Sequence, residues 1–205
     1  MKKTPLIFLA IISFASSCAF AQGIMYIFDQ QSSTNEAPWP YGSGSTLQQI
    51  TPPYGQSFTP TLTMIDFIRL NLNDANVLDG AGATIYINLH VDSLSGATIG
   101  TTAAVTMPNS FTGPATFSFP TSVTLVPGTT YYFEPVVQSG SGPWNTAGGE
   151  LNYPGGSAYV NGQPQIGSDL WFREGIVVPE PSPVDRSTSK RDATSERFGI
   201  TNTSL

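Results

Sequence analysis

Hydrophobic and polar residues alternate with a period of two along several stretches of the chain. In residues 83–92 apolar side chains occupy every second position, and polar side chains fill the positions between them. This pattern predicts a strand with one buried face and one wet face. Similar alternation recurs in residues 62–73, 115–119, 131–138 and 169–173, whereas helical periodicity is almost absent after residue 21.

Turn-forming residues separate these runs, at Asp79-Gly80, Ser95-Gly96, Pro108-Asn109, Pro127-Gly128 and Gly155-Gly156. Many short strands without intervening helices predict an all-β fold. We expect a single domain made of two packed antiparallel sheets, a β-sandwich connected in jelly-roll fashion. A repeat of fixed period is not seen, which argues against a solenoid or a propeller.

The N-terminus has the three parts of a secretory signal peptide. Lys2 and Lys3 precede an apolar run at residues 5–14, and Ala19-Phe20-Ala21 forms a small-x-small cleavage site. We expect cleavage after Ala21 and a secreted protein. The apolar run is too short for a membrane-spanning helix, and we expect no membrane span in the mature chain. The alternative is a lipoprotein modified at Cys18, since Ala15-Ser16-Ser17-Cys18 loosely follows a lipobox.

Cysteine content and charge restrict the stabilising forces and the partners. Cys18 is the only cysteine, so a chain cleaved after Ala21 has neither disulfides nor thiolate metal sites and depends on a packed core. Between residues 22 and 178, two arginines stand against ten acids, a balance of −8. Nucleic acid and anionic lipid are therefore poor partners, while cations and neutral, hydroxyl-rich ligands remain open.

Composition divides the chain into three parts. Residues 1–21 are the leader, residues 22–178 form the β-sandwich domain, and residues 179–205 are polar enough to predict a disordered tail. Within the domain, residues 32–54 are rich in Ser, Gly, Pro and Thr and predict a long surface loop that carries Trp39 and Tyr41. We expect a monomer.

Candidate catalytic residues are sparse, and we expect no enzyme. His90 is the only histidine and lies on the polar face of its predicted strand, where a solvated side chain is expected. The chain lacks a Gly-x-Ser-x-Gly motif and the His or Cys ligands of a zinc site. The alternative, a glycan-active hydrolase, would use two of Glu134, Glu150 and Glu174, about 5–10 Å apart.

Residues 71–80 concentrate oxygen donors in one predicted loop. Asp74, Asn76 and Asp79 would be the ligands of a calcium ion, which prefers carboxylate and amide oxygens. The closing glutamate of an EF-hand is missing. Asn and Asp also form turns without any ion. The segment therefore favours a turn, with a calcium-stabilised surface protein as the alternative.

Aromatic residues suggest a polar-aromatic binding surface. Trp171 and Arg173 are expected on one strand face with Asp169, as a platform for a sugar ring or as a salt-bridged structural patch. The aromatic residues in or near glycine-rich loops are Trp39, Tyr41, Trp144, Tyr153 and Tyr159. Such residues either stack on sugar rings or cover the open ends of a sandwich.

A family resemblance enters at Val178-Pro179-Glu180-Pro181-Ser182, which resembles the start of a PEP-CTERM sorting signal of exported proteins in exopolysaccharide-producing bacteria. That family continues with a membrane-spanning apolar run and an arginine cluster, which residues 183–205 lack. The chain would then be released unanchored, or a frameshift after Ser182 has replaced the tail.

The body resembles the β-sandwich modules found ahead of such signals, at residues 56–59 (QSFT), 123–132 (VTLVPGTTYY) and 169–173 (DLWFR). These modules look like carbohydrate-binding jelly rolls. The resemblance therefore implies a secreted, non-catalytic protein of the cell envelope or exopolysaccharide matrix, with polysaccharide as its partner.

Overall fold

The computed structural model describes residues 23–35, 45–140 and 142–180, and every regular element in these ranges is a β-strand. Residues 24–178 form one compact unit. The all-β prediction is confirmed. The predicted leader, Trp39, Tyr41 and the predicted tail beyond residue 180 lie outside the described residues.

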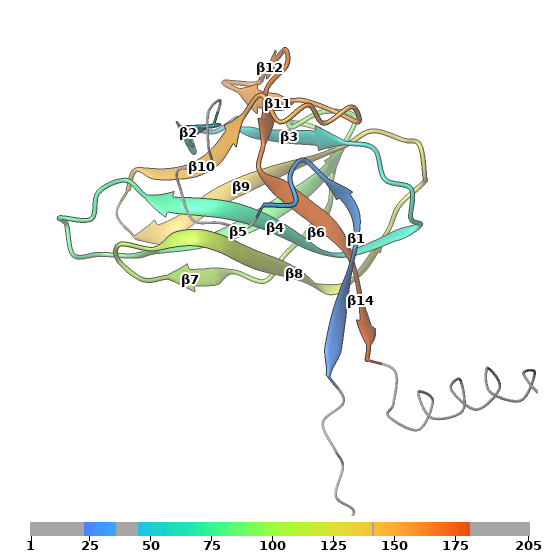
Figure 1. The fold of residues 1–205 in the computed structure, drawn as a ribbon, viewed down its shortest axis with the longest axis horizontal. Helices are drawn as coiled ribbons and strands as arrows, with labels where there is room; N and C mark the ends of the chain where they lie inside the picture. The colour runs from blue at the N-terminus through green and yellow to red at the C-terminus, as the bar shows by residue number, and fades with distance from the viewer. Residues whose placement is uncertain (1–22, 36–44, 141, 181–205) are drawn as a thin grey trace, which may run out of the picture. The chain divides into compact units, whose positions relative to one another are not determined.

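Two sheets make up the sandwich (Figure 1). Sheet A has the strand order β1 (Ile24–Gln31), β14 (Phe172–Pro179), β4 (Met64–Asp74), β10 (Trp144–Gly149) and β13 (Asp169–Leu170), with β2 (Ser45–Gln49) beside β10 and β8 (Thr112–Thr124) beside β4. Sheet B has the order β12 (Gln163–Gln165), β11 (Ala158–Val160), β3 (Gly55–Phe58), β9 (Tyr131–Gly140), β5 (Ala83–Val91) and β6 (Thr98–Thr101), with β7 (Val105–Met107) also beside β5.

The chain crosses between the sheets at nearly every long connection. It passes from β3 in sheet B to β4 in sheet A and back to β5, and later from β8 to β9 to β10 in the same manner. Strands that are distant in sequence therefore become neighbours: β4 pairs with β8, and β5 pairs with β9, both antiparallel. This connectivity agrees with the predicted antiparallel, jelly-roll-like sandwich.

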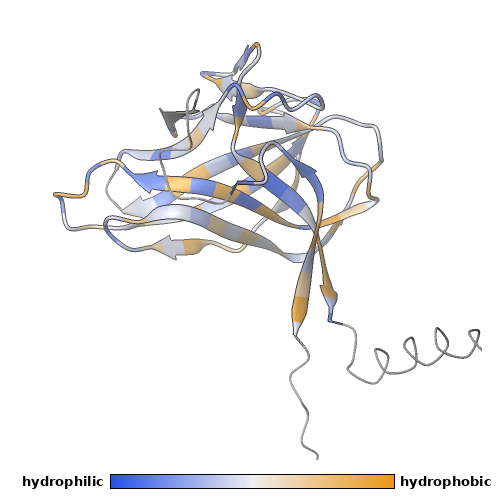
Figure 2. Ribbon diagram, viewed as in Figure 1, coloured by the Kyte–Doolittle hydropathy of each residue, from blue (hydrophilic) through white to orange (hydrophobic). Residues whose placement is uncertain are grey.

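The core lies between the sheets and is built from the predicted apolar positions. Burial alternates along β5, where Ile85, Ile87 and Leu89 have no exposed surface, and the strands in Figure 2 alternate between hydrophilic and hydrophobic accordingly. Phe133 of sheet B meets Phe172 of sheet A edge to face, with ring centroids 5.4 Å apart. Such a contact contributes about 0.5–1.5 kcal/mol beyond the area that it buries.

A second, smaller apolar layer covers the outer face of sheet A. Phe67 points away from the core, yet it has no exposed surface. The rings of Tyr26 and Phe28 on β1 pack edge to face against it, with centroids 4.9 and 5.7 Å away. Strand β1 also runs beside β14, and the two extend together beyond the neighbouring strands (Figure 1). Tyr26 and Phe28 therefore cover Phe67, whereas Ile24, Met25 and Ile27 of β1 remain exposed.

The predicted surface loop at residues 32–54 is partly wrong. Residues 45–49 form β2, which pairs with β10 over five residues. Ile50 and Tyr54 are buried in the core, and the Tyr54 hydroxyl forms a hydrogen bond with the Thr146 hydroxyl. The segment has little alternation of its own, so the pattern did not predict a strand. It forms one because β10 supplies the backbone hydrogen-bond partners.

Candidate functional site

The outer face of sheet B carries polar side chains beside two hollows. Thr84, Tyr86 and Asn88 of β5 point outward and are partly exposed, because the residues between them fill the core. These are the polar positions of the most regular alternation in the sequence. Their placement on a wet face confirms that part of the strand prediction.

A β-bulge brings further polar side chains to the same face. Thr84 pairs with Ser139 of β9, whereas Ile85 pairs with Val137, so Gln138 is an extra residue in β9. A bulge redirects the extra side chain and increases the local twist. Gln138 and Ser139 are both exposed as a result, and both line hollows on this face.

The opposite edge of β5 is paired with two short strands that are separated by a gap. Here β6 and β7 cover the two ends of β5, and Thr102 bridges the gap between them. The Thr102 backbone N–H donates to the Ile87 carbonyl, and the Thr102 hydroxyl accepts from the Ile87 N–H, each at 2.9 Å. The break leaves a depression over the middle of β5.

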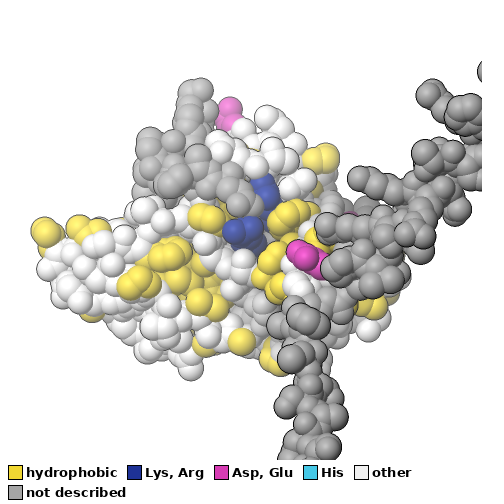
Figure 3. All heavy atoms as spheres, turned by 60° about the horizontal axis from the view of Figure 1, so that its bottom comes forward, with side chains coloured by type: hydrophobic (Ala, Val, Ile, Leu, Met, Phe, Trp, Pro, Cys, Tyr) yellow, Lys and Arg dark blue, Asp and Glu magenta, His cyan; other side chains and the backbone are white. Residues whose placement is uncertain are grey.

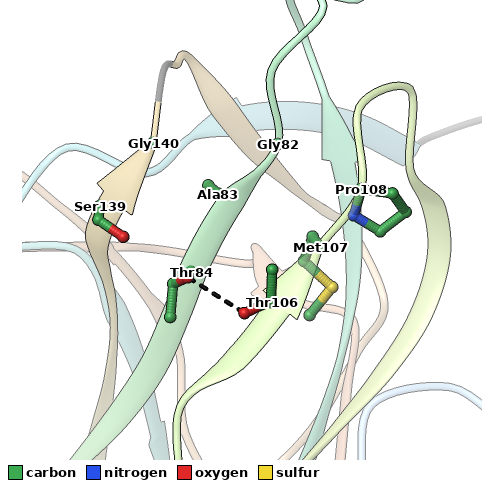
Figure 4. A pocket seen from close by; sticks show the side chains of 8 residues that line it. All are labelled: Gly82, Ala83, Thr84, Thr106, Met107, Pro108, Ser139 and Gly140. Atoms are coloured by element: carbon green, nitrogen blue, oxygen red, sulfur yellow. Dashed lines mark hydrogen bonds between the residues drawn. The ribbon is translucent and has the colours of Figure 1, made fainter.

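Two shallow hollows follow β5, and we call them together the β5 furrow. The first is lined by Tyr86, Asn88, Thr101, Thr102, Ala104 and Gln138. The second, in Figure 4, is lined by Gly82, Ala83, Thr84, Thr106, Met107, Pro108, Ser139 and Gly140. The hydroxyls of Thr84 and Thr106 lie 3.2 Å apart across the second hollow (Figure 4). The furrow therefore offers hydroxyl and amide groups beside one aromatic ring.

The turn between β5 and β6 closes one end of this face over His90. The exposed fraction of His90 is only 5%, and its Nδ1 lies 3.2 Å from both the Gly96 carbonyl and the Thr98 hydroxyl. Leu94 of the same turn lies over Gly55, which has no side chain to displace it. The prediction of a solvated His90 is wrong, because the turn folds back over the strand face.

His90 also faces an acid from the neighbouring strand. Its Nε2 lies 3.6 Å from a carboxylate oxygen of Glu134, which is partly exposed. Burial raises the pKa of the Glu134 carboxyl, and the charge of His90 acts in the opposite direction. Beside this pair, Tyr132 and Tyr159 meet edge to face with centroids 5.6 Å apart. Tyr159 is thus a predicted binding residue that lies partly exposed on this outer face.

Trp144 and Trp171 are buried, so the structure corrects their assignment to an exposed surface. Trp144 begins β10 and belongs to the core, with 1% of its surface exposed. Trp171 is also 1% exposed, and its Nε1 donates to the Asn35 carbonyl at 2.7 Å. Neither ring offers a face to a sugar, because strand pairing and the segment after β1 cover them.

Arg173 forms the predicted cation–π contact, in a buried setting. Its guanidinium carbon lies 5.4 Å from the Trp171 ring centroid and 4.9 Å from that of Phe28, and its Nε donates to the Ser33 carbonyl at 2.9 Å. It is opposite Arg69 in the register of β4 and β14. Figure 3 shows basic side chains among hydrophobic ones. Burial of the guanidinium against both rings favours a structural role over an open sugar platform, while the expected salt bridge stays a prediction.

The carboxylate of Asp169 bonds to Tyr153 and Gln56. One carboxylate oxygen of Asp169 accepts the Tyr153 backbone N–H at 2.9 Å, and the other accepts Gln56 Nε2 at 3.1 Å. Asp169 therefore anchors the segment at Tyr153. Leu170 and Phe172 both belong to the core, and Arg173 lies over the Trp171 ring, so the predicted alternation holds from Leu170 to Arg173.

The calcium candidates form a hydrogen-bonded turn. The two carboxylate oxygens of the buried Asp74 accept the backbone N–H groups of Asn76 and Ser110, both at 2.9 Å. Asn76 donates its side-chain amide to Asp79 at 3.1 Å. In the described part of the chain, no group of three or more His, Cys, Asp or Glu could hold a metal ion. These contacts agree with the turn interpretation.

An acidic cluster, made of the buried Glu174 and the partly exposed Asp29, lies where β14 meets β1. Glu174 has no exposed surface, and neither of its carboxylate oxygens has a hydrogen-bond partner among the described residues. Burial is the main cause that raises the pKa of Glu174 to about 9, and the charge of Asp29 acts in the same direction, while the Gln30 backbone N–H acts in the opposite direction. The sequence analysis did not identify this cluster. The burial of Glu174 depends on the position of β1, which the local alternation does not give.

Asp29 behaves in the opposite way to Glu174. Burial raises its pKa, but hydrogen bonds from Thr61 and Leu62 outweigh that effect, so its pKa is lowered overall. The network continues through Gln30, whose side-chain oxygen accepts the Tyr153 hydroxyl at 3.0 Å. The cluster therefore holds one ionised and one protonated carboxyl near neutral pH.

The three hydrolase candidates lie in different surroundings. Glu134 faces His90 on the outer face of sheet B, Glu150 is exposed after β10, and Glu174 is fully buried.

The described residues also contain no helix with the length and apolar content needed to cross a membrane.

Comparisons with known proteins add little. No protein-family model matches the chain, and no curated protein matches it. Among solved structures, the chain is similar to one described as "Structure of infectious bursal disease virus Gx strain", with 14% identity and a TM-score of 0.24. The match covers 92% of this chain and 53% of the viral chain, so the chain spans about half the length of that relative. A TM-score this low does not indicate a shared fold.

Proposed function

We propose that this chain is a secreted, non-catalytic β-sandwich protein of the cell envelope or exopolysaccharide matrix that binds glycans weakly through the outer face of sheet B. The observation that carries the proposal is the β5 furrow, where Tyr86 lies among hydroxyl and amide side chains. Sugar rings present apolar faces to aromatic rings and hydroxyls to polar groups, so this combination suits them.

Two further features support a binding role over a catalytic one. Glycoside hydrolysis needs a raised-pKa carboxyl beside the scissile bond. Glu174 has a raised pKa but no exposed surface. The pKa of Glu134 is also raised, but its carboxylate faces His90 and is not among the residues that line the furrow. The furrow is shallow, which fits weak binding of a chain better than enclosure of a reacting group.

Export and the PEP-CTERM-like junction motivate the location. Both remain expectations from residues 1–21 and 178–182. N-terminal sequencing of the mature protein from culture medium should begin at Gln22. A chain that begins at Cys18 would instead indicate a lipoprotein, and retention of the full leader in the cytosol would contradict secretion.

Pull-down of the protein on insoluble and immobilised polysaccharides tests glycan binding. We expect retention that is weakened by Tyr86→Ala. The control is Tyr26→Ala, which removes a tyrosine of β1 in sheet A and should leave retention unchanged. A protein that binds none of the polysaccharides would contradict the proposed function.

A further inference from the structure

The course of the β5 furrow restricts the shape of its ligand. Thr84, Tyr86 and Asn88 point outward from successive alternate positions of one strand. Thr84 and Asn88 are four residues apart, about 14 Å at roughly 3.4 Å per residue. The two hollows lie along this line, one at each end. A ligand that fills both is therefore extended along β5.

The charge around the furrow restricts the chemistry of the ligand. All the residues that line the two hollows are uncharged. Two acids flank the furrow along these strands: Glu134, the register partner of Asn88, and Asp92, which follows β5 and is exposed. The two arginines of the described residues, Arg69 and Arg173, belong to β4 and β14 of sheet A. An anionic ligand would meet these carboxylates, and the basic group beside them, His90, is buried and faces Glu134.

The polar groups in the furrow suit neutral hydroxyls. The Asn88 side-chain oxygen accepts the Thr101 hydroxyl at 2.9 Å, which leaves the amide nitrogen of Asn88 to donate outward. Gln138 contributes a second amide, redirected to this face by the bulge in β9. Amides and hydroxyls both donate and accept, as sugar hydroxyls do.

From these observations we infer that the β5 furrow binds an uncharged, extended glycan chain lying parallel to β5, and that Glu134 and Asp92 disfavour polyanionic chains. The inference rests on the proposed function and specifies its ligand. Tyr86 stacks on a sugar ring at the middle of the furrow, and the amides of Asn88 and Gln138 contact the hydroxyls of that ring and its neighbours.

The test measures binding of the full-length protein to a panel of immobilised polysaccharides. The neutral members are a linear β-glucan, a mannan, a galactan and methyl-esterified polygalacturonate; the anionic members are alginate, hyaluronate and free polygalacturonate. We expect every retained member to be neutral. Tyr86→Ala should weaken retention about tenfold, and Tyr26→Ala should not change it.

The outcomes separate this inference from the function on which it rests. Preferential retention of the anionic members, or neutral binding that is insensitive to both Tyr86→Ala and Asn88→Ala, would overturn the inference while glycan binding stood. No retention of any member would remove both. The double variant Glu134→Gln, Asp92→Asn should increase retention of free polygalacturonate at low salt, and an unchanged value would show that these acids exclude nothing.

Discussion

Replacing Glu174 by glutamine should change how the stability of the protein depends on pH. The folded protein raises the pKa of this buried carboxyl from 4.5 to about 9, by burial and by the charge of Asp29. In the unfolded chain the carboxyl is ionised above pH 4.5, whereas the folded protein keeps it protonated. Its contribution to stability is therefore fully present below pH 4.5 and is lost as pH rises toward 9.

The size of the effect follows from the interval between the pKa of Glu174 in the unfolded chain and its pKa in the folded protein. Each pH unit between the two pKa values lowers the free energy of unfolding by about 1.36 kcal/mol. Between pH 5 and pH 8 the wild-type protein should lose about 4 kcal/mol through this one carboxyl. Glu174→Gln removes the titration. The difference in stability between variant and wild type should therefore shift in favour of the variant by that amount over the same range.

Urea unfolding at pH 5, 6, 7 and 8 measures the difference, followed by the fluorescence of the buried Trp144 and Trp171. A constant penalty from placing an amide in this site does not affect the slope with pH. The matched control is Glu150→Gln, because Glu150 is exposed and its difference from wild type should stay flat. Parallel curves for wild type and Glu174→Gln would refute the reasoning that Glu174 is protonated in the folded protein.

Two more predictions concern buried hydrogen bonds. Tyr54→Phe should cost about 1–3 kcal/mol, because it removes the hydroxyl that bonds to Thr146 inside the core. Adding Thr146→Val should recover part of that loss in urea unfolding, and a double variant less stable than the sum of the two single variants would contradict the pairing. Asp74→Ala should cost about 1–3 kcal/mol by removing the acceptors of two backbone N–H groups. The melting temperature of the wild type should not respond to calcium or to a chelator, and a calcium-dependent rise would revive the ion-site alternative.

Local patterns in the sequence determined the strand content and much of the core. Alternation in residues 83–92 predicted β5 and its buried face, and the turn residues at Asp79-Gly80 and Pro127-Gly128 lie outside strands. Both signals are local: alternation reflects the two-residue period of an extended chain, and turn residues reflect backbone preferences. Such properties can be read from a single sequence, and they sufficed for the sandwich.

The details of the candidate site depended on which strands pair and how they fold back. The extra residue Gln138 reaches the furrow through a bulge between β5 and β9, and His90 is buried because the following turn folds over it. Trp144 and Trp171 are covered by segments distant in sequence, as Glu174 is by β1. Burial and register on these faces are long-range properties, because a side chain's surroundings are set by partners that the local pattern does not name. The sequence therefore determined which residues alternate, and only the tertiary structure decided which of the polar and aromatic ones remain open to a ligand.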